Sequence, residues 1–252
     1  MFEKILLIPA FKDNYIWLLV RDGRAAVVDP GEPEPVIERL ETLGLQLESI
    51  LITHHHADHQ GGIAALQARW QAEVFGPEIE SITGCNHPLS GGETITILGQ
   101  QVKVMAVPGH TLGHLAYYVP GALFCGDTLF GAGCGRLFEG SPAQMSQSLA
   151  SIAELPDDTL IYCAHEYTEA NLRFAVAVEP SNTNLQARFK QVAELRAAGL
   201  PSVPSTLAEE KATNPFLRSG EPAVIAAALK HAAVDRSKVA VFAAIRQWRN
   251  SF

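Results

Sequence analysis

The chain has 252 residues, 47% of them hydrophobic, and a formal net charge of −8. A chain of this length and composition can bury a large core, so we expect a soluble globular protein with one large domain, alone or with a smaller appendage. The acidic charge argues against a general nucleic-acid binder, which needs a basic face to contact phosphates. It also disfavours an anionic substrate, unless basic side chains gather at one place.

The N-terminus and the cysteines bear on the compartment. The apolar run Ile5–Ile8 is too short for a secretory signal, and no stretch approaches the length of a membrane span. The four cysteines show no CxxC spacing, and two of them fall within predicted strands. We therefore expect free thiols in a reducing compartment, which favours the cytoplasm. The cysteines are Cys85, Cys125, Cys134 and Cys163.

Up to about residue 160 the hydrophobic pattern is dominated by strands, with helices between them. The predicted elements, in chain order, are strands at 15–20 and 25–29, a helix at 35–43, a strand at 49–53, a helix that begins near Gly61, and strands at 94–98, 101–107, 114–119 and 122–126. The pairs Asp22-Gly23 and Gly99-Gln100 favour hairpin turns, and Gly44 suits a helix C-terminus. Hairpins mixed with crossover helices predict an α/β fold in which helices cover sheets.

After residue 166 the periodicity becomes helical. The predicted helices cover 184–198, 222–232 and 235–249. Asn184 is a candidate N-cap for the first of them, and Gly199 is a suitable stop. We therefore expect a strand-rich domain over 1–165 and a smaller helical domain over 166–252, which could complete the core or form one wall of a substrate cleft.

One short loop concentrates side chains that bind metals. The segment T-H-H-H-A-D-H-Q-G-G follows the apolar run at 50–52 and holds four histidines and a carboxylate. Imidazole nitrogen and carboxylate oxygen suit divalent Zn, Fe and Mn. The alternative is a solvated polar loop or a chance histidine tract. In an extended loop His54, His56 and Asp58 would share one face, whereas His55 and His59 would point elsewhere.

Three later candidate ligands also stand at or just beyond the end of a strand-like run. The runs are 102–107 before His110, 122–125 before Asp127, and 160–163 before His165. Short apolar runs rich in Val, Ile and Phe are typical of buried strands. Four strands that end in ligands predict a site along one edge of a sheet.

The motifs of the chain resemble those of a known superfamily. They are T-H-H-H-A-D-H-Q-G-G at 53–62, G-H-T-L-G-H at 109–114, C-G-D-T-L-F at 125–130 and A-H-E-Y-T at 164–168. With them the chain resembles the metallo-β-lactamase superfamily. The G-C-G-R at 133–136, the N-P-F at 214–216 and the basic C-terminal helix make it similar, over its whole length, to the glyoxalase II family of hydroxyacylglutathione hydrolases. The resemblance implies an αββα sandwich followed by a smaller helical C-terminal domain.

The resemblance also implies a set of metal ligands. One metal would be held by His54, His56 and His110, the other by Asp58, His59 and His165, with Asp127 bridging both. It implies two divalent ions per chain, with Zn favoured and Fe or Mn as alternatives. Asp29 stands where the superfamily has an acid near the ligands, and such a carboxylate orients a ligating imidazole. The alternative is that Asp29 only begins the turn before Pro30.

The implied reaction is hydrolysis of a thioester. A hydroxide bridging the metals would cleave S-D-lactoylglutathione, and related 2-hydroxyacylglutathiones, to glutathione and D-lactate, the second step of methylglyoxal detoxification. Asp58 and Asp127 are the candidate catalytic carboxylates, and Asp58 is a candidate for the proton released on attack. No side-chain nucleophile is required, so Ser141 and Cys134, which lack a His-acid partnership in sequence, are taken as structural.

The resemblance places five side chains against glutathione. They are Arg136, Phe138, Tyr167, Arg246 and Arg249. Guanidinium groups suit carboxylates, and Arg246 and Arg249 would face the same way on a helix, although an ordinary solvated face is the alternative. Phe138 departs from a tyrosine expected in many relatives, so one hydrogen bond to glutathione is lost. We expect a monomer without nucleic-acid or membrane partners.

Rival functions stay open at this point. Within the superfamily, the rivals are a persulfide dioxygenase with one iron, another lactamase-like hydrolase, and a nuclease, which the acidic charge disfavours. A rival of a different class is a metal-dependent scaffold or binding module without chemistry, and the presence of all seven candidate ligands argues against it. The complete second set of ligands favours the binuclear hydrolase. Of the remaining histidines, His114 is expected in the core or beside the ligands, and His87 and His231 in solvent.

Overall fold

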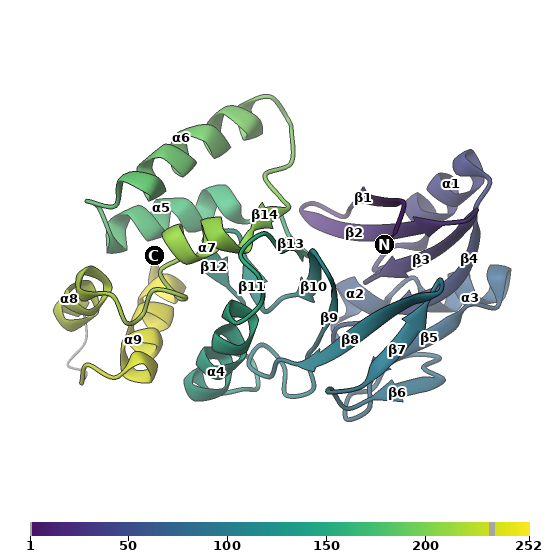
Figure 1. Ribbon diagram of the computed structural model, residues 1–252, viewed down its shortest axis with the longest axis horizontal. Coiled ribbons are helices and arrows are strands. Elements are labelled where there is room, and N and C mark those ends of the chain that lie inside the picture. Colours follow the sequence, from purple (N-terminus) through teal and green to yellow (C-terminus); the bar gives the residue numbers. More distant parts are fainter. Residues whose placement is uncertain (1, 232–234) are drawn as a thin grey trace. The chain divides into compact units, whose positions relative to one another are not determined.

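The computed structural model describes residues 2–231 and 235–252. By its internal contacts the chain forms two compact units (Figure 1). The first comprises Met1–Ala106 and Leu112–Gly126, and the second comprises Val107–Thr111 and Asp127–Phe252. The chain therefore passes between the units at three junctions. The sequence-based domain boundary at 165/166 stays a prediction.

The first unit is built on a mixed sheet of order β1-β2-β3-β4-β5-β6. Its strands are β1 (Lys4–Ala10), β2 (Asn14–Arg21), β3 (Arg24–Val28), β4 (Gln46–Leu51), β5 (Glu73–Pro77) and β6 (His87–Leu89). The first three strands are antiparallel, and β3 to β6 are parallel. Asp22 and Gly23 both have positive φ, as the predicted hairpin turn requires.

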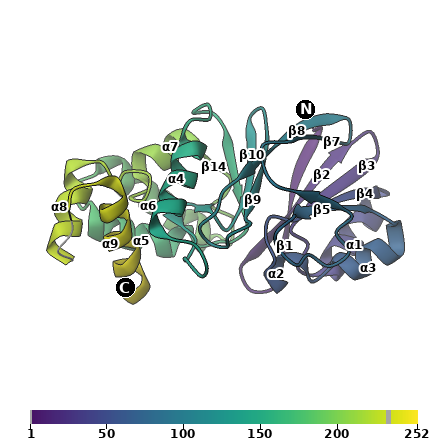
Figure 2. The ribbon, with the colours of Figure 1, turned by 90° about the horizontal axis from the view of Figure 1, so that it is seen from below.

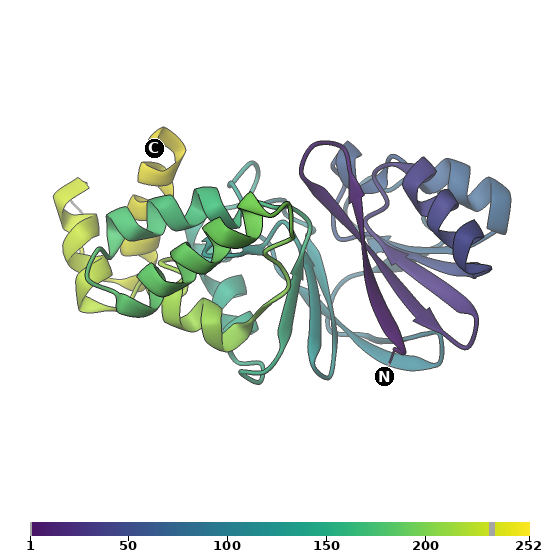
Figure 3. The same cartoon turned by 90° about the horizontal axis from the view of Figure 1, so that it is seen from above.

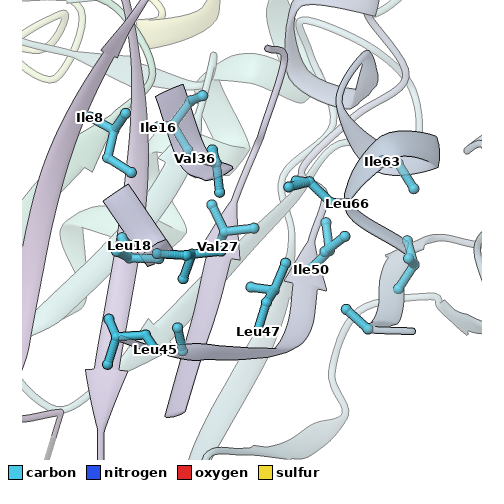
Figure 4. Close-up of a cluster of buried hydrophobic side chains, with 14 of the residues drawn as sticks. Ile8, Ile16, Leu18, Val27, Val36, Leu45, Leu47, Ile50, Ile63 and Leu66 are labelled. Carbon is cyan, nitrogen blue, oxygen red and sulfur yellow. The ribbon is translucent and has the colours of Figure 1, made fainter. Parts of the chain in front are cut away.

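Parallel neighbours need crossover connections, and helices supply them. Helix α1 (Pro33–Leu43) joins β3 to β4, and the short α2 (Ala57–Gln60) with α3 (Ile63–Trp70) joins β4 to β5. The helices lie beside the strands of this sheet (Figure 3). They bury Val36, Leu40, Ile63 and Leu66 against apolar side chains of β1 to β4, and Figure 4 labels Val36, Ile63 and Leu66 among them. Gly44 ends α1 in the left-handed conformation, as predicted.

A second sheet of the first unit is an antiparallel meander. Its strands in this unit are β7 (Thr94–Ile97), β8 (Gln100–Ala106), β9 (Leu115–Val119) and β10 (Ala122–Gly126). The buried Tyr117 hydroxyl donates to the Ile52 carbonyl at 2.7 Å and so ties β9 to the end of β4. Because β4 belongs to the first sheet and β8 and β10 to the second, the prediction that all the ligands follow strands of one sheet is wrong.

The second unit is mainly helical, as predicted for the last third of the chain (Figures 1 and 2). Its elements are β11 (Leu129–Phe130), β12 (Gly133–Cys134), α4 (Pro142–Ala153), β13 (Leu160–Cys163), α5 (Thr168–Val178), α6 (Thr183–Ala197), β14 (Ser205–Thr206), α7 (Leu207–Thr213), α8 (Pro222–His231) and α9 (Lys238–Ser251). Leu172 and Ala175 of α5 pack with Leu185 and Val192 of α6. Among the described residues, no helix has the length and hydropathy needed to span a membrane.

The ends of α6 show one error of the sequence analysis. The predicted stop at Gly199 has a φ of 71°. The N-cap, however, is Asn182 and not Asn184, because the Asn182 side chain accepts a hydrogen bond from the Leu185 amide at 3.1 Å. Asn184 is the second residue of the observed helix and is exposed. Both asparagines are plausible caps in sequence, and only the backbone path decides between them.

Replacement of Asn182 by alanine is expected to lower the free energy of unfolding by about 1 kcal/mol, because an amide at the helix start loses its acceptor. The matched control, Asn184→Ala, should change stability by less than about 0.5 kcal/mol, since this side chain is exposed within the helix. Urea unfolding followed by circular dichroism measures both. A larger loss for Asn184→Ala than for Asn182→Ala would contradict the observed cap.

Candidate metal centre and substrate pocket

The histidine-rich loop of the first unit is not extended throughout. Thr53 and His54 lie in a bend, His56 is extended, and His54 Nε2 is 2.9 Å from His56 Nδ1. Asp58 and His59 instead belong to α2, where Asp58 Oδ2 is 3.5 Å from His59 Nε2. The prediction that Asp58 shares a face with His54 and His56 is therefore wrong, because the helical turn directs it towards His59. The loop presents two pairs of ligand atoms.

Asp29 supports this loop through three contacts. Its carboxylate accepts from the Thr53 amide at 2.8 Å and the Thr53 hydroxyl at 2.7 Å, and it lies 3.0 Å from His59 Nδ1. The Asp29 carbonyl also accepts from the Gly31 amide, so a turn begins there too. Asp29 thus both contacts an imidazole, as expected of an orienting acid, and begins the turn before Pro30. A carboxylate at Nδ1 fixes the ring and its tautomer.

Thr53 continues the same chain of contacts to His54. Because its hydroxyl donates to Asp29, its oxygen is left to accept from His54 Nδ1, which lies 3.0 Å away. In the neutral form of each ring, a proton on Nδ1 leaves a lone pair on Nε2. The Nε2 atoms of His54 and His59 are therefore oriented as metal ligands.

In the second unit two buried histidines face opposite oxygens of one carboxylate. His110 Nε2 is 3.4 Å from Asp127 Oδ2, and His165 Nε2 is 3.3 Å from Asp127 Oδ1. His110 Nδ1 lies 2.8 Å from the Arg136 carbonyl, which can only accept, so Nδ1 carries the proton. A lone pair on Nε2 then points at a carboxylate oxygen. Two acceptors that face each other favour a cation between them.

The distances fit such a cation. Bonds of about 2.0–2.2 Å in a tetrahedral site place two ligand atoms roughly 3.3–3.6 Å apart. The separations of Asp127 from His110 and His165, and of Asp58 from His59, are 3.4, 3.3 and 3.5 Å. These are longer than an ordinary N–H···O bond. The donor atoms of each unit thus fit Zn, Fe or Mn by chemistry and by spacing.

A cavity of about 510 Å³ lies within the second unit. It is lined by His110, Asp127, Phe130, Cys134, Arg136, Phe138, Tyr167, Ala170, Asn171, Arg246 and Arg249. All five side chains expected to contact glutathione are among them. The candidate metal ligands His110 and Asp127 also line the cavity. A molecule bound there can therefore contact these two ligands and the five other side chains at once.

Three arginines make this cavity positive although the whole chain is acidic. Arg246 is buried and donates to the Cys134 carbonyl at 2.9 Å, and Arg249 donates to Asn171 Oδ1 at 3.4 Å. Burial lowers the pKa of Arg249, and the charges of Arg246 and Arg136 lower it further. Among the residues that the structure describes, no carboxylate lies within ion-pair distance of these three. The local gathering of basic groups that an anionic substrate requires is present.

Two aromatic side chains flank the ligands in this cavity. The Tyr167 ring stacks on His165, with centroids 4.7 Å apart and planes at 4°. Phe138 is 63% exposed and meets His110 edge to face at 5.2 Å. Phe138 therefore offers an apolar wall, and it has no hydroxyl with which to bind a ligand.

Two polar residues of the site, Asn14 and Asn171, belong to no motif that the sequence analysis could recognise. Asn14 donates to Asp58 Oδ2 at 2.9 Å and so holds that carboxylate. Asn171 lines the cavity and donates to the Gly131 carbonyl at 3.1 Å. Both are single amides within a strand and a helix, and only the folded backbone brings them to the site.

The remaining histidines have other partners. His114 is fully buried and its ring stacks on His54 at 4.7 Å, which agrees with a place beside the ligands. His55 pairs with Glu80 at 2.9 Å. His87 and His231 stack on Phe75 and Trp248, respectively.

Comparison with known proteins places the chain in a family. A model described as "Metallo-beta-lactamase superfamily" matches residues 11–165, and one described as "Hydroxyacylglutathione hydrolase C-terminus" matches residues 166–252. A protein of Dechloromonas aromatica named hydroxyacylglutathione hydrolase is 72% identical over 99% of both chains. The chain belongs to the hydroxyacylglutathione hydrolase family of the metallo-β-lactamase superfamily. Proteins of the same name from Methylobacillus flagellatus and Aeromonas hydrophila are 56% identical over 100% of both chains, and 51% identical over 98% of this chain and 99% of the relative.

Solved structures agree on the fold. The structure of BLEG-1 B3 metallo-beta-lactamase has a TM-score of 0.65 at 23% identity, covering 85% of this chain and 99% of the other. That of ETHE1 from Myxococcus xanthus has a TM-score of 0.67 at 24% identity, covering 94% and 88%. The α/β fold with a helical C-terminal domain, expected from the family motifs, is confirmed.

The buried thiols yield a prediction on pH. Burial raises the pKa of the Cys163 thiol to about 12 from an ordinary value of 9.0. A raised folded-state pKa stabilises the fold fully below the ordinary value, and this contribution is lost as the pH rises towards 12. Iodoacetamide at about pH 7.5 should therefore modify the partly exposed Cys85 and spare Cys163, because the thiolate is the nucleophile. Peptide mass spectrometry checks this; alkylation of Cys163 as fast as in urea would contradict it.

Proposed function

We propose that this chain hydrolyses S-D-lactoylglutathione to glutathione and D-lactate, as the second step of methylglyoxal detoxification. The reaction class, metal-dependent thioester hydrolysis of hydroxyacylglutathiones, follows from its family. The observation that carries the proposal is the 72% identity, over 99% of both chains, with a protein named for this activity. The lactoyl group is the finer part of the proposal, and the arginine-lined cavity supports a glutathione moiety.

The proposed metal centre joins the ligands of the two units. One ion would be held by His54, His56 and His110, the second by Asp58, His59 and His165, and Asp127 would be shared. The oriented Nε2 lone pairs in both units support this assignment. The shared role of Asp127 is supported by the two histidines that face its two oxygens.

The covalent chain also supports one shared centre. The Gly126 backbone lies against Thr53, since a Cβ added to Gly126 would be 2.3 Å from Thr53 Oγ1. Asp127 follows Gly126 directly, so its Cα lies about 3.8 Å further along the chain. Asp127 therefore begins the second unit one residue after this contact within the first unit. His110, in turn, stands two residues before Leu112, where the chain re-enters the first unit.

Divalent ions in such a centre acidify a water molecule and polarise a carbonyl group. Asp58 is the proposed acceptor of the proton released when water attacks the acyl carbon, and its 43% exposed side chain, held by Asn14, supports that role. The carbon–sulfur bond then breaks, and glutathione leaves as a thiolate. Zn is the proposed metal, with Fe or Mn as alternatives, because imidazole and carboxylate ligands suit all three.

The arginines are proposed to bind the carboxylates of glutathione. Arg246 and Arg249 occupy one face of α9, and Arg136 adds a third charge to the same cavity. Tyr167 and Phe138 would flank the acyl group near His165 and His110. The proposal also includes a monomer in the cytoplasm without nucleic-acid or membrane partners, and the absence of disulfides among the four cysteines supports a reducing compartment.

The test of the proposed reaction uses full-length protein loaded separately with Zn, Fe and Mn. Each metal form that binds is expected to consume S-D-lactoylglutathione, seen as loss of thioester absorbance. Protein stripped of metal should be inactive and regain activity on reloading. A lack of turnover with all three metals, together with oxygen uptake on glutathione persulfide, would favour the dioxygenase instead.

Replacement of Arg249 by alanine should raise KM about tenfold or more and change kcat much less, because the lost contact acts on ground-state binding remote from the metals. The control is Arg173→Ala on α5, an exposed arginine paired with Glu169. It should leave both constants unchanged. Steady-state kinetics with the thioester measures KM and kcat for both variants. An unchanged KM for Arg249→Ala would show that Arg249 does not bind the substrate and only belongs to a charged, solvated helix face.

A further inference from the structure

A buried carboxylate outside the candidate ligands joins two segments of the first unit. Glu80 lies beyond β5, and its side chain is only 5% exposed. Its Oε2 accepts from the His55 amide at 2.7 Å and lies 2.9 Å from His55 Nδ1. Its Oε1 accepts from the Gly113 amide at 2.8 Å. One side chain thus bridges residues that are far apart in the sequence.

The bridged residues stand directly beside metal-binding side chains. His55 lies between His54 and His56, so fixing its amide and ring fixes the backbone from which both neighbours project. Gly113 precedes His114, whose ring stacks on His54 with centroids 4.7 Å apart and planes at 18°. Glu80 therefore holds both sides of this stack.

The contact with Gly113 depends on the lack of a side chain there. A Cβ at Gly113 would lie 2.6 Å from Glu80 Cγ, a separation that real Cβ atoms essentially never show. The His55 carbonyl is held separately by the Gln60 side chain. The peptide around His55 is thus fixed on its amide side by Glu80 and on its carbonyl side by Gln60.

Burial of a carboxylate is costly unless donors satisfy it, and Glu80 has three. A plain loop anchor would need only one oxygen, whereas here each oxygen serves a different segment. We propose that Glu80 is a positioning residue that sets the affinity of the metal site formed by His54 and His56. This inference rests on the proposed function, because it concerns the metal centre assigned there. Changes to such supporting partners typically cost about 10–100-fold in metal affinity.

Glu80→Gln tests the proposal in the full-length protein. Glutamine keeps the volume but accepts through only one oxygen, so one of the two segments loses its partner. Zinc affinity, measured by competition with a chromogenic chelator, is expected to fall about 10–100-fold for the weaker-bound ion. The melting temperature of metal-free protein should stay within a few degrees of wild type, and KM at saturating zinc should be unchanged.

Two further variants sharpen the test. Glu78→Gln is the matched control, because this neighbouring carboxylate accepts from the Ser90 hydroxyl and touches neither segment; its zinc affinity should equal that of wild type. His55→Ala removes only the ring contact and keeps the backbone one, so it should show a smaller loss than Glu80→Gln. It also keeps the proposal testable if Glu80→Gln does not fold.

The outcomes separate the two levels of inference. Wild-type zinc affinity in both Glu80→Gln and His55→Ala would overturn the role of Glu80 while leaving the metal centre intact. A loss of metal-free stability that matches the loss of zinc affinity would also overturn it, since Glu80 would then be merely structural. If wild-type protein itself bound none of Zn, Fe and Mn, the proposed function would fail instead.

Discussion

The site depends on the direction in which its imidazole lone pairs point. His59, His54 and His110 each have an acceptor at Nδ1, supplied by Asp29, Thr53 and the Arg136 carbonyl, respectively. A proton held at Nδ1 leaves Nε2 as the ligand atom. The three acceptors come from three different segments, so the fold itself chooses the tautomers. The Asp58 and Asp127 carboxylates lie 3.5 and 3.4 Å from the Nε2 atoms of His59 and His110, respectively. Two ligands of one cation lie at such a separation.

Under the proposed function, the same arrangement would connect catalysis with substrate binding. The Arg136 carbonyl orients His110, while the Arg136 side chain lines the positive cavity with Arg246 and Arg249. Asp127 and His110, two of the proposed metal ligands, line the same cavity. An anionic molecule bound by the arginines is therefore directed towards the carboxylate that two histidines face. An acidic chain can bind an anion here because its basic groups are concentrated locally.

Much of the molecule could be predicted from sequence because the informative residues are contiguous. The motifs around His54 and His110 indicate the superfamily, and the residues at 133–136 and 214–216 with the basic C-terminal helix indicate the family. Hydrophobic periodicity indicates α1 and the last helices. Pairing between strands has no such local signal, so β4 and β8 were wrongly expected in one sheet. The helix α2 has only four residues, which is too short to show helical periodicity in the sequence. Asp58 was therefore expected in an extended loop, on the face of His54 and His56.

The supporting residues were missed for a different reason. Asn14, Glu80 and Asn171 are isolated polar residues whose partners lie far along the chain. No spacing rule marks them, because their role arises only when distant segments meet. The start of α4 is an opposite case: Ser141 and Gln144 form a capping box whose pattern is visible in the sequence and could have located that helix.

The most direct test of the central claim is a crystal structure of the zinc-loaded protein with anomalous data collected at the zinc edge. The account predicts two peaks per chain, one beside His54, His56 and His110 and one beside Asp58, His59 and His165, with Asp127 in contact with both. A single peak, or peaks whose ligands all come from one compact unit, would contradict it.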